Sequence, residues 1–200
     1  MEKKFIVIEG IDGSGGETQS KLLYNYLKER GRKAVRITYP DYENPIGRLI
    51  HEYLHEKYEF SPEIQFLLYA SDMIKDKEKI KDWLEKNYFV IADRYFTSTI
   101  VYQGLQGFGI KKALKFAELF EIIKPDIIVY LKISPETSIK RKMKEKKELD
   151  RNEENKEFLR KVSEFYEKVI SDQVFGKWVV IDGEKTKEEV FEEIKKVLEI

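Results

Sequence analysis

Short apolar runs recur along the chain, separated by longer segments in which apolar residues repeat with helical spacing. The runs are rich in β-branched and aromatic residues, and such continuous apolar stretches are typical of parallel strands buried on both faces. They predict five strands, over Phe5–Ile8, Ala34–Ile37, Phe89–Ala92, Ile127–Leu131 and Trp178–Ile181. The segments between and after them predict helices, over about 17–30, 46–55, 62–86, 97–122, 135–172 and 186–198.

This alternation of strands and helices predicts one three-layer α/β domain over residues 1–200. Gly31 is placed to end the first helix, and Ser134-Pro135 is placed to begin a later one. In such folds ligands bind at the carboxyl ends of the strands. The residues that directly follow each strand are therefore the first candidates for a functional site.

Composition narrows the class of protein. The chain has 200 residues, of which 42% are hydrophobic, enough for a sizeable core. Charged residues reach 37%, yet 37 Lys and Arg balance 37 Asp and Glu. This balance argues against charge-driven disorder and against a globally basic partner for nucleic acid. The surplus of Lys and Glu resembles the composition of hyperthermophile proteins.

The chain has no cysteine, which excludes disulfides, thiolate catalysis and Cys-ligated zinc. No apolar run approaches the roughly 20 residues that cross a bilayer. The N-terminus enters its first strand without a signal-peptide pattern. We therefore expect a cytoplasmic protein with no membrane partner.

A glycine-rich loop follows the first predicted strand and precedes an amphipathic helix. Its glycines Gly10 and Gly15 satisfy the phosphate-loop pattern G-x-x-x-x-G-K-[ST], in which backbone N–H groups and a helix N-terminus bind phosphate. The pattern then fails, because Gly16 stands at the lysine position and Glu17 at the magnesium-binding hydroxyl position. The backbone N–H groups should still bind phosphate, but without the positive charge of the lysine. A glycine-rich turn without a ligand is the alternative.

The third predicted strand is followed by Asp93-Arg94-Tyr95. A carboxylate at this place beside a phosphate loop can hold Mg²⁺, and the adjacent Arg can bind a phosphate bidentately. On these residues alone, a surface ion pair explains the sequence equally well.

Together these segments resemble the thymidylate kinase family over nearly the whole chain. The resemblance rests on Glu9 to Gly15, Tyr39-Pro40, Gly47, Leu67 to Ala70 and Asp93 to Gln103. It implies a P-loop kinase fold with five parallel strands in the order 2-3-1-4-5. It also implies transfer of the ATP γ-phosphate to a nucleoside monophosphate, typically dTMP, with Mg²⁺ and in a homodimer.

The resemblance also implies roles for individual residues. Asp93 would serve the metal, Arg94 would hold the acceptor phosphate, and Asp12 would lie near the acceptor sugar and phosphate. The ATP-binding residues would be Gly10, Ile11, Asp12, Gly13, Ser14, Gly15, Gly16, Glu17 and Thr18. The acceptor-binding residues would be Tyr39, Pro40, Tyr69, Arg94, Ser98, Tyr102 and Gln103. From the residues alone, these aromatics could equally be part of the core.

A charged stretch near 140–154 matches the lid of family members whose phosphate loop carries no extra Arg. Arg141 and Arg151 would then be catalytic cations, with Lys144 beside them. A closing lid excludes water and adds positive charge when substrates are bound. The alternative interpretation is a solvated helix and loop.

Departures from the family leave a second function open. Besides Gly16 and Glu17, Met73 stands where an Arg usually reads thymine O4, and Tyr42 stands where many relatives contact the acceptor with an Arg. The alternative is therefore a nucleotide-binding regulator or a weakly active pseudo-kinase. Loss of one charge-stabilising group commonly costs about 10² to 10³ in rate.

The segment His51-Glu52-Tyr53-Leu54-His55 satisfies the zinc-protease pattern H-E-x-x-H. These are the only two histidines of the chain, so a third ligand would have to be a carboxylate. Two histidines on a solvated helix face are the simpler interpretation.

Overall fold

The structure, a computed structural model, describes residues 4–145 and 156–200. Its strands are β1 (Phe5–Glu9), β2 (Ala34–Thr38), β3 (Phe89–Asp93), β4 (Ile127–Lys132) and β5 (Trp178–Asp182). The helices are α1 (Gly16–Glu29), α2 (Pro45–Leu54), α3 (Pro62–Ile74), α4 (Lys77–Glu85), α5 (Phe96–Leu105), α6 (Ile110–Leu119), α7 (Pro135–Glu145), α8 (Lys156–Ser171) and α9 (Lys187–Leu198).

The five strands form one parallel sheet in the order β2-β3-β1-β4-β5, which confirms the predicted fold. Each strand ends one residue later than its apolar run predicts. The added residues are polar, and all lie at the carboxyl edge: Glu9, Thr38, Asp93, Lys132 and Asp182. Backbone pairing therefore carries polar side chains to the edge where ligands bind in this architecture.

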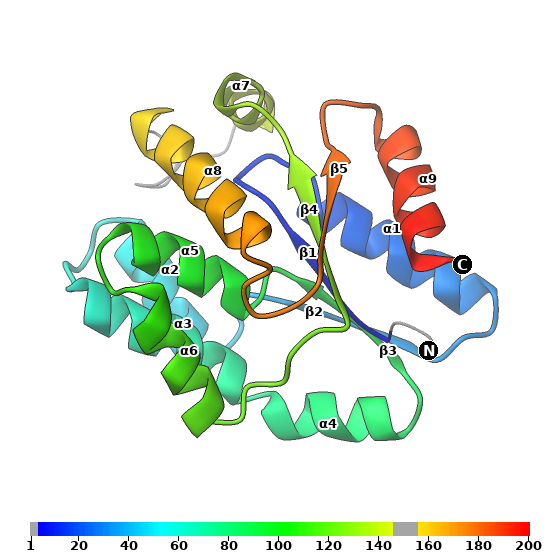
Figure 1. The fold of residues 1–200 in the computed structure, drawn as a ribbon, viewed down its shortest axis with the longest axis horizontal. Coiled ribbons are helices and arrows are strands. Elements are labelled where there is room, and N and C mark those ends of the chain that lie inside the picture. The colour runs from blue at the N-terminus through cyan, green and yellow to red at the C-terminus, as the bar shows by residue number, and fades with distance from the viewer. Residues whose placement is uncertain (1–3, 146–155) are drawn as a thin grey trace.

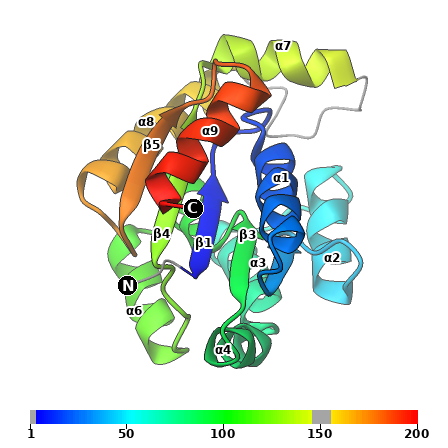
Figure 2. The same ribbon diagram turned by 90° about the vertical axis from the view of Figure 1, so that its right-hand side faces the viewer.

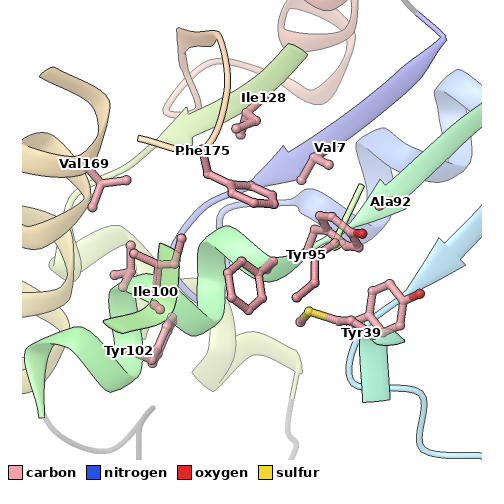
Figure 3. Close-up of a cluster of buried hydrophobic side chains, with 14 of the residues drawn as sticks. Val7, Tyr39, Ala92, Tyr95, Ile100, Tyr102, Ile128, Val169 and Phe175 are labelled. Carbon is pink, nitrogen blue, oxygen red and sulfur yellow. The ribbon is translucent and has the colours of Figure 1, made fainter. Parts of the chain in front are cut away.

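Helices cover both faces of the sheet (Figures 1 and 2). α1 and α9 lie on one face, where Leu23 and Ile194 pack against Ile6 and Ile8 of β1. α5 and α8 lie on the other face. The side chains of this second layer are shown in Figure 3, where Tyr95, Ile100, Val169 and Phe175 gather against Val7, Ala92 and Ile128 of the sheet.

Two of the predicted helix boundaries are confirmed by hydrogen bonds. Gly31 follows the C-cap of α1 with a φ of 70°, and its N–H donates to the Lys28 carbonyl. At the start of α7, the Ser134 hydroxyl accepts a bond from the N–H of Thr137. Both contacts satisfy backbone groups that a helix end leaves unpaired.

Three predicted helices are each divided in two. The 97–122 segment breaks where Gly107 and Gly109 adopt φ angles of 98° and 87°. The 62–86 segment breaks at Lys75-Asp76, whose carboxylate accepts bonds from Lys75 and Lys79. The 135–172 segment is α7 and α8, with 146–155 outside the described residues. Most of the predicted lid, including Arg151, lies outside the described residues as well. Among the helices described, none is both long enough and apolar enough to cross a membrane.

Candidate active site

The glycine-rich loop joins the end of β1 to the start of α1. Gly13 and Gly15 have φ angles of 74° and 97°, in the left-handed region that residues with side chains disfavour. Gly15 is the N-cap of α1, and no described side chain caps the helix there. The first N–H groups of α1 therefore remain available to an anion, which the positive end of the helix dipole also attracts.

A cavity of about 760 Å³ opens beside this loop. Every residue predicted to bind ATP, from Gly10 to Thr18, lines it, together with Asp93 and Arg94 at the end of β3. α7, the β5–α9 loop and the start of α9 add basic side chains to its wall, namely Arg141, Lys142, Lys144, Lys185 and Lys187. The size and the basic wall suit a nucleoside triphosphate.

Arg141 connects three segments around this cavity. Its Nη1 donates to the carbonyl of Gly13 at 3.1 Å, and its Nη2 donates to the carbonyl of Gly183 at 2.8 Å. The guanidinium thus joins α7 to the phosphate loop and to the β5–α9 loop. The predicted role of its companion Arg151 stays a prediction.

Gly16 and Glu17 open the first turn of α1. A Cβ added to Gly16 would lie 2.7 Å from Oδ1 of Asp93, so this carboxylate occupies the space next to the missing side chain. The Glu17 side chain is mostly exposed and forms an ion pair with Lys21, one turn further along α1, at 2.6 Å. The position that usually carries a hydroxyl therefore presents a carboxylate at the solvent side of the turn.

Asp93 ends β3 directly beside the phosphate loop, paired in register with Ile8. Its carboxylate is nearly buried and accepts a bond from Nη2 of Arg36 at 3.1 Å. Burial raises the pKa of Asp93 from 3.8 to about 6, because a desolvated carboxylate resists ionisation. The charges of Arg94 and Arg36 offset part of this rise in pKa, and those of Glu17 and Glu9 add to it.

Arg94 lies between the two predicted substrate sites. Its backbone is left-handed, with a φ of 63°, and its N–H donates to the carbonyl of Ile8. The guanidinium pairs with Asp12 at 2.6 Å and also donates to the Ser98 hydroxyl at 3.3 Å. A left-handed non-glycine residue costs about 1–3 kcal/mol, a strain that is common where a side chain is aimed at a ligand.

Arg94 also lines a second, smaller cavity of about 90 Å³. All seven predicted acceptor residues line it: Tyr39, Pro40, Tyr69, Arg94, Ser98, Tyr102 and Gln103. Asp12 lines it too, and the Tyr102 hydroxyl donates to Asp12 at 3.3 Å. The structure therefore brings together side chains from the phosphate loop, the β2–α2 loop, α3 and α5.

Met73 and Thr99 form another part of this smaller cavity. Met73 is buried, and its sulfur lies 4.0 Å from the hydroxyl of Thr99. The departure from the family pattern points to Met73, but no sequence prediction includes Thr99. Thr99 could have been inferred from its position directly after Ser98 on α5.

Glu9 belongs to the motif that resembles the family, but the sequence indicates no role for it. Its buried carboxylate accepts bonds from the N–H groups of Tyr95 and Ser98, at 3.1 Å each. It also accepts bonds from the hydroxyls of Thr97, Ser98 and Tyr166. One carboxylate at the end of β1 thus anchors the start of α5, which carries much of the smaller cavity, and joins it to α8.

His51 lies on α2 and His55 directly follows that helix, and neither is among the described residues that line the two cavities. Their rings stack with centroids 4.1 Å apart, and Nδ1 of His55 lies 2.9 Å from the His51 carbonyl. Within residues 4–145 and 156–200, no group of three or more His, Cys, Asp or Glu residues is arranged to hold a metal ion.

The sheet order, the glycine loop beside the central strand and the adjoining smaller cavity define a P-loop kinase of the nucleoside monophosphate type. Comparison with known families is more specific. A family model described as thymidylate kinase matches residues 8–194. The chain belongs to the thymidylate kinase family, as its motifs suggest.

Individual relatives are similar over nearly their whole length. The thymidylate kinase of Caldicellulosiruptor saccharolyticus is 38% identical, over 100% of this chain and 97% of the relative. That of Carboxydothermus hydrogenoformans is 39% identical, over 100% and 98%. A probable thymidylate kinase of Methanococcus aeolicus is 38% identical, over 98% and 95%.

Proposed function

We propose that this chain transfers the γ-phosphoryl group of ATP to a nucleoside monophosphate, with dTMP as the preferred acceptor, on the route to dTTP. One observation carries the proposal. The large cavity and the small cavity share a wall made of Asp12, Tyr39, Pro40, Tyr42 and Arg94. A donor in the first and an acceptor in the second would meet at this wall, which is the arrangement that direct phosphoryl transfer needs.

The donor side binds phosphate through the backbone. The N–H groups of Gly13 to Thr18 and the N-terminus of α1 would hold the β- and γ-phosphates. Arg141 lies against the same loop, at the Gly13 carbonyl, and Lys142 and Lys144 line the same cavity. We include in the proposal a lid over about 140–154, whose closure would exclude water from the transferred group.

The acceptor side orients the attacking oxygen. Arg94 would bind the acceptor phosphate, Tyr69 would stack on the base, and Tyr102 with Gln103 would lie along the nucleoside. An oxygen of the acceptor phosphate then attacks the γ-phosphorus, and the bond from that phosphorus to the ADP oxygen breaks. Because the acceptor phosphate is already anionic, positioning and charge neutralisation supply most of the catalysis.

Asp93 at the end of β3 fits one ligand position of a magnesium ion, whose other ligands would be phosphate and water oxygens. Asp93 is a nearly buried carboxylate with one oxygen turned toward the phosphate loop, and Mg²⁺ prefers oxygen ligands. Asp93 would hold the ion directly or through water. When bound, Mg²⁺ neutralises charge that develops on the β- and γ-phosphates.

The intact acceptor cavity favours an enzyme over a regulator that only binds nucleotide. We further propose a homodimer. Its support is that large apolar side chains are exposed on α3, at Ile64 and Leu67, and at the end of α6, at Leu119 and the C-cap residue Phe120. The two helices are joined by an edge-to-face contact between Phe66 and Phe116. Sedimentation of the protein and of Leu67→Asp tests this part of the proposal, since a dimer should dissociate in the variant.

An ATP-consumption assay over dTMP, dUMP, UMP, CMP, AMP and GMP tests the function. We expect magnesium-dependent formation of ADP that is fastest with dTMP. Arg94→Ala, purified in the same way, controls for contaminating kinases. Absence of transfer to every acceptor, by folded protein that binds ATP, would reject the enzyme in favour of the regulator.

A further inference from the structure

The phosphate loop has no lysine of its own. Gly16 leaves that position without a side chain, and Oδ1 of Asp93 lies 2.7 Å from where a Cβ would be. The carboxylates of Asp93, Glu9 and Glu17 lie near the first turn of α1. Because these negative charges repel one another, a cation is needed to keep Asp93 in position before a phosphate binds.

Arg36 on β2 supplies this cation. It lies opposite Ile91 in register, while Thr38 lies opposite Asp93. Since side chains two residues apart share one face of a sheet, Arg36 and Asp93 project from the same face, toward α1. Nη2 of Arg36 donates to Oδ2 of Asp93 at 3.1 Å, and four-fifths of the Arg36 side chain is buried.

The same guanidinium also reaches the first turn of α1. Nε of Arg36 donates to the Ser20 hydroxyl at 2.7 Å, and that hydroxyl donates to the Glu17 carbonyl at 3.0 Å. Ser20 is fully buried. Arg36 therefore links the carboxylate at the end of β3 to the backbone of the turn that follows Gly16. It is not among the described residues that line the large cavity, so it acts through Asp93 and Ser20.

We propose that Arg36 is a positioning residue for phosphoryl transfer, which takes over part of the task of the missing loop lysine. It holds Asp93 toward the metal and phosphate position and fixes the first turn of α1. The planar guanidinium suits this double contact, because its N–H groups point in fixed directions and it stays charged. The inference rests on the proposed function for its kinetic part only.

Three single variants test the proposal: Arg36→Met removes the charge, Arg36→Lys keeps it, and Ser20→Ala removes one anchor. Arg30→Met is the matched control, since Arg30 is exposed at the other end of α1 and packs on the Tyr26 ring. The first readout is calorimetric ATP affinity with Mg²⁺ and with EDTA. Loss of a residue that orients a metal-binding group typically costs about 10- to 100-fold in metal affinity or activity.

We expect Arg36→Met to lose most of the gain in ATP affinity that Mg²⁺ provides. Arg36→Lys should retain part of this gain, because it keeps the charge but not the double contact, and Arg30→Met should retain all of it. In kinetics, Arg36→Met should lower kcat about 10- to 100-fold with the acceptor KM nearly unchanged. Adding Gly16→Lys to Arg36→Met should restore part of kcat. A folded Arg36→Met that keeps the magnesium gain and kcat within threefold would overturn the proposal.

Should Arg36→Met fail to fold, Ser20→Ala decides the question. It leaves Arg36 in place and substitutes a good helix former. A several-fold loss of kcat at unchanged thermal stability would support positioning, and wild-type kcat would reject it. If wild-type protein transfers phosphate to no acceptor, the proposed function fails, whereas the calorimetric comparison still tests Arg36.

Discussion

Arg94 and Asp12 form an ion pair of 2.6 Å across the wall that separates the two cavities. Asp12 comes from the phosphate loop and Arg94 from the residue after β3. The Asp12 carboxylate is thus the partner of the guanidinium that would bind the acceptor phosphate, and it holds that guanidinium in the shared wall. If Arg94 binds the acceptor phosphate as proposed, that binding has to loosen or share this pair.

Removing the guanidinium should therefore affect the acceptor far more than ATP. We expect Arg94→Ala to raise the acceptor KM at least tenfold or to abolish transfer. A charge-assisted bond to phosphate contributes about 1.5–3 kcal/mol. Calorimetry should give an ATP affinity within a few fold of the unchanged protein. Collapse of ATP binding with intact acceptor binding would show that the two roles are assigned to the wrong substrates.

Activity should depend on the ionisation of Asp93. Burial raises the pKa of Asp93 to about 6, and only the ionised carboxylate can hold Mg²⁺ well. We therefore expect kcat/KM for MgATP to rise with pH through about 6, because this ratio reports the free enzyme. The measurement is a rate profile from pH 5 to 8 with controls for protein stability. A profile that is flat over this range would contradict the assignment.

The raised pKa of Asp93 also affects the stability of the protein. Activity should rise as the pH rises through about 6, whereas the contribution of Asp93 to stability should fall. A folded pKa above the unfolded one means that Asp93 favours folding when protonated, and that this contribution is lost as pH rises through about 6. We expect Asp93→Asn to stabilise the ligand-free protein at pH 8 and to be nearly neutral at pH 3.5. The gap between 3.8 and about 6 corresponds to at most about 3 kcal/mol. Urea denaturation at both pH values measures this difference.

Met73 should limit recognition of the base at its 4-position. The Met73 thioether and the Thr99 hydroxyl line the small cavity, and the resemblance to the family implies that position 73 faces the 4-position of the base. An Arg there could donate to a 4-oxo group and would reject a 4-amino group. We expect Met73→Arg to raise the preference for dTMP over dCMP by at least tenfold, since hydrogen-bonding sites discriminate strongly. Met73→Leu should leave the preference unchanged. Equal kcat/KM ratios in all three proteins would mean that other groups read this edge.

Glu9 should be a stability determinant that acts on α5. Glu9→Gln keeps the shape but replaces a charged acceptor of five bonds by a neutral group with one accepting oxygen and an NH₂ group that only donates. We expect a loss of about 2–4 kcal/mol in the free energy of unfolding, and about 1 kcal/mol for Tyr166→Phe, which removes one bond. Denaturant titration measures both. A Glu9→Gln loss below that of Tyr166→Phe would argue against an anchoring role.

Local pattern was sufficient to determine the five strands and the glycine loop. Continuous apolar runs identify strands that are buried on both faces, and glycines at Gly13 and Gly15 permit backbone angles that other residues avoid. The resemblance to a family added the sheet order and the residues of the acceptor cavity. Helix breaks were harder to predict, because at Lys75-Asp76 the break depends on side-chain bonds to α3 and α4 rather than on a proline.

The tertiary structure alone decided which polar residues meet. Arg36 and Asp93 are 57 positions apart, and Glu9 and Tyr166 are 157 positions apart. Neither pairing can be predicted from the pattern of the sequence. Each of these side chains is an ordinary polar residue in or at the end of a strand or on a helix. The register of the parallel sheet brings Arg36 up to Asp93, and the packing of α5 and α8 on one face encloses Glu9. Long-range backbone pairing and the requirement to satisfy buried charge therefore complete a site that local sequence only outlines.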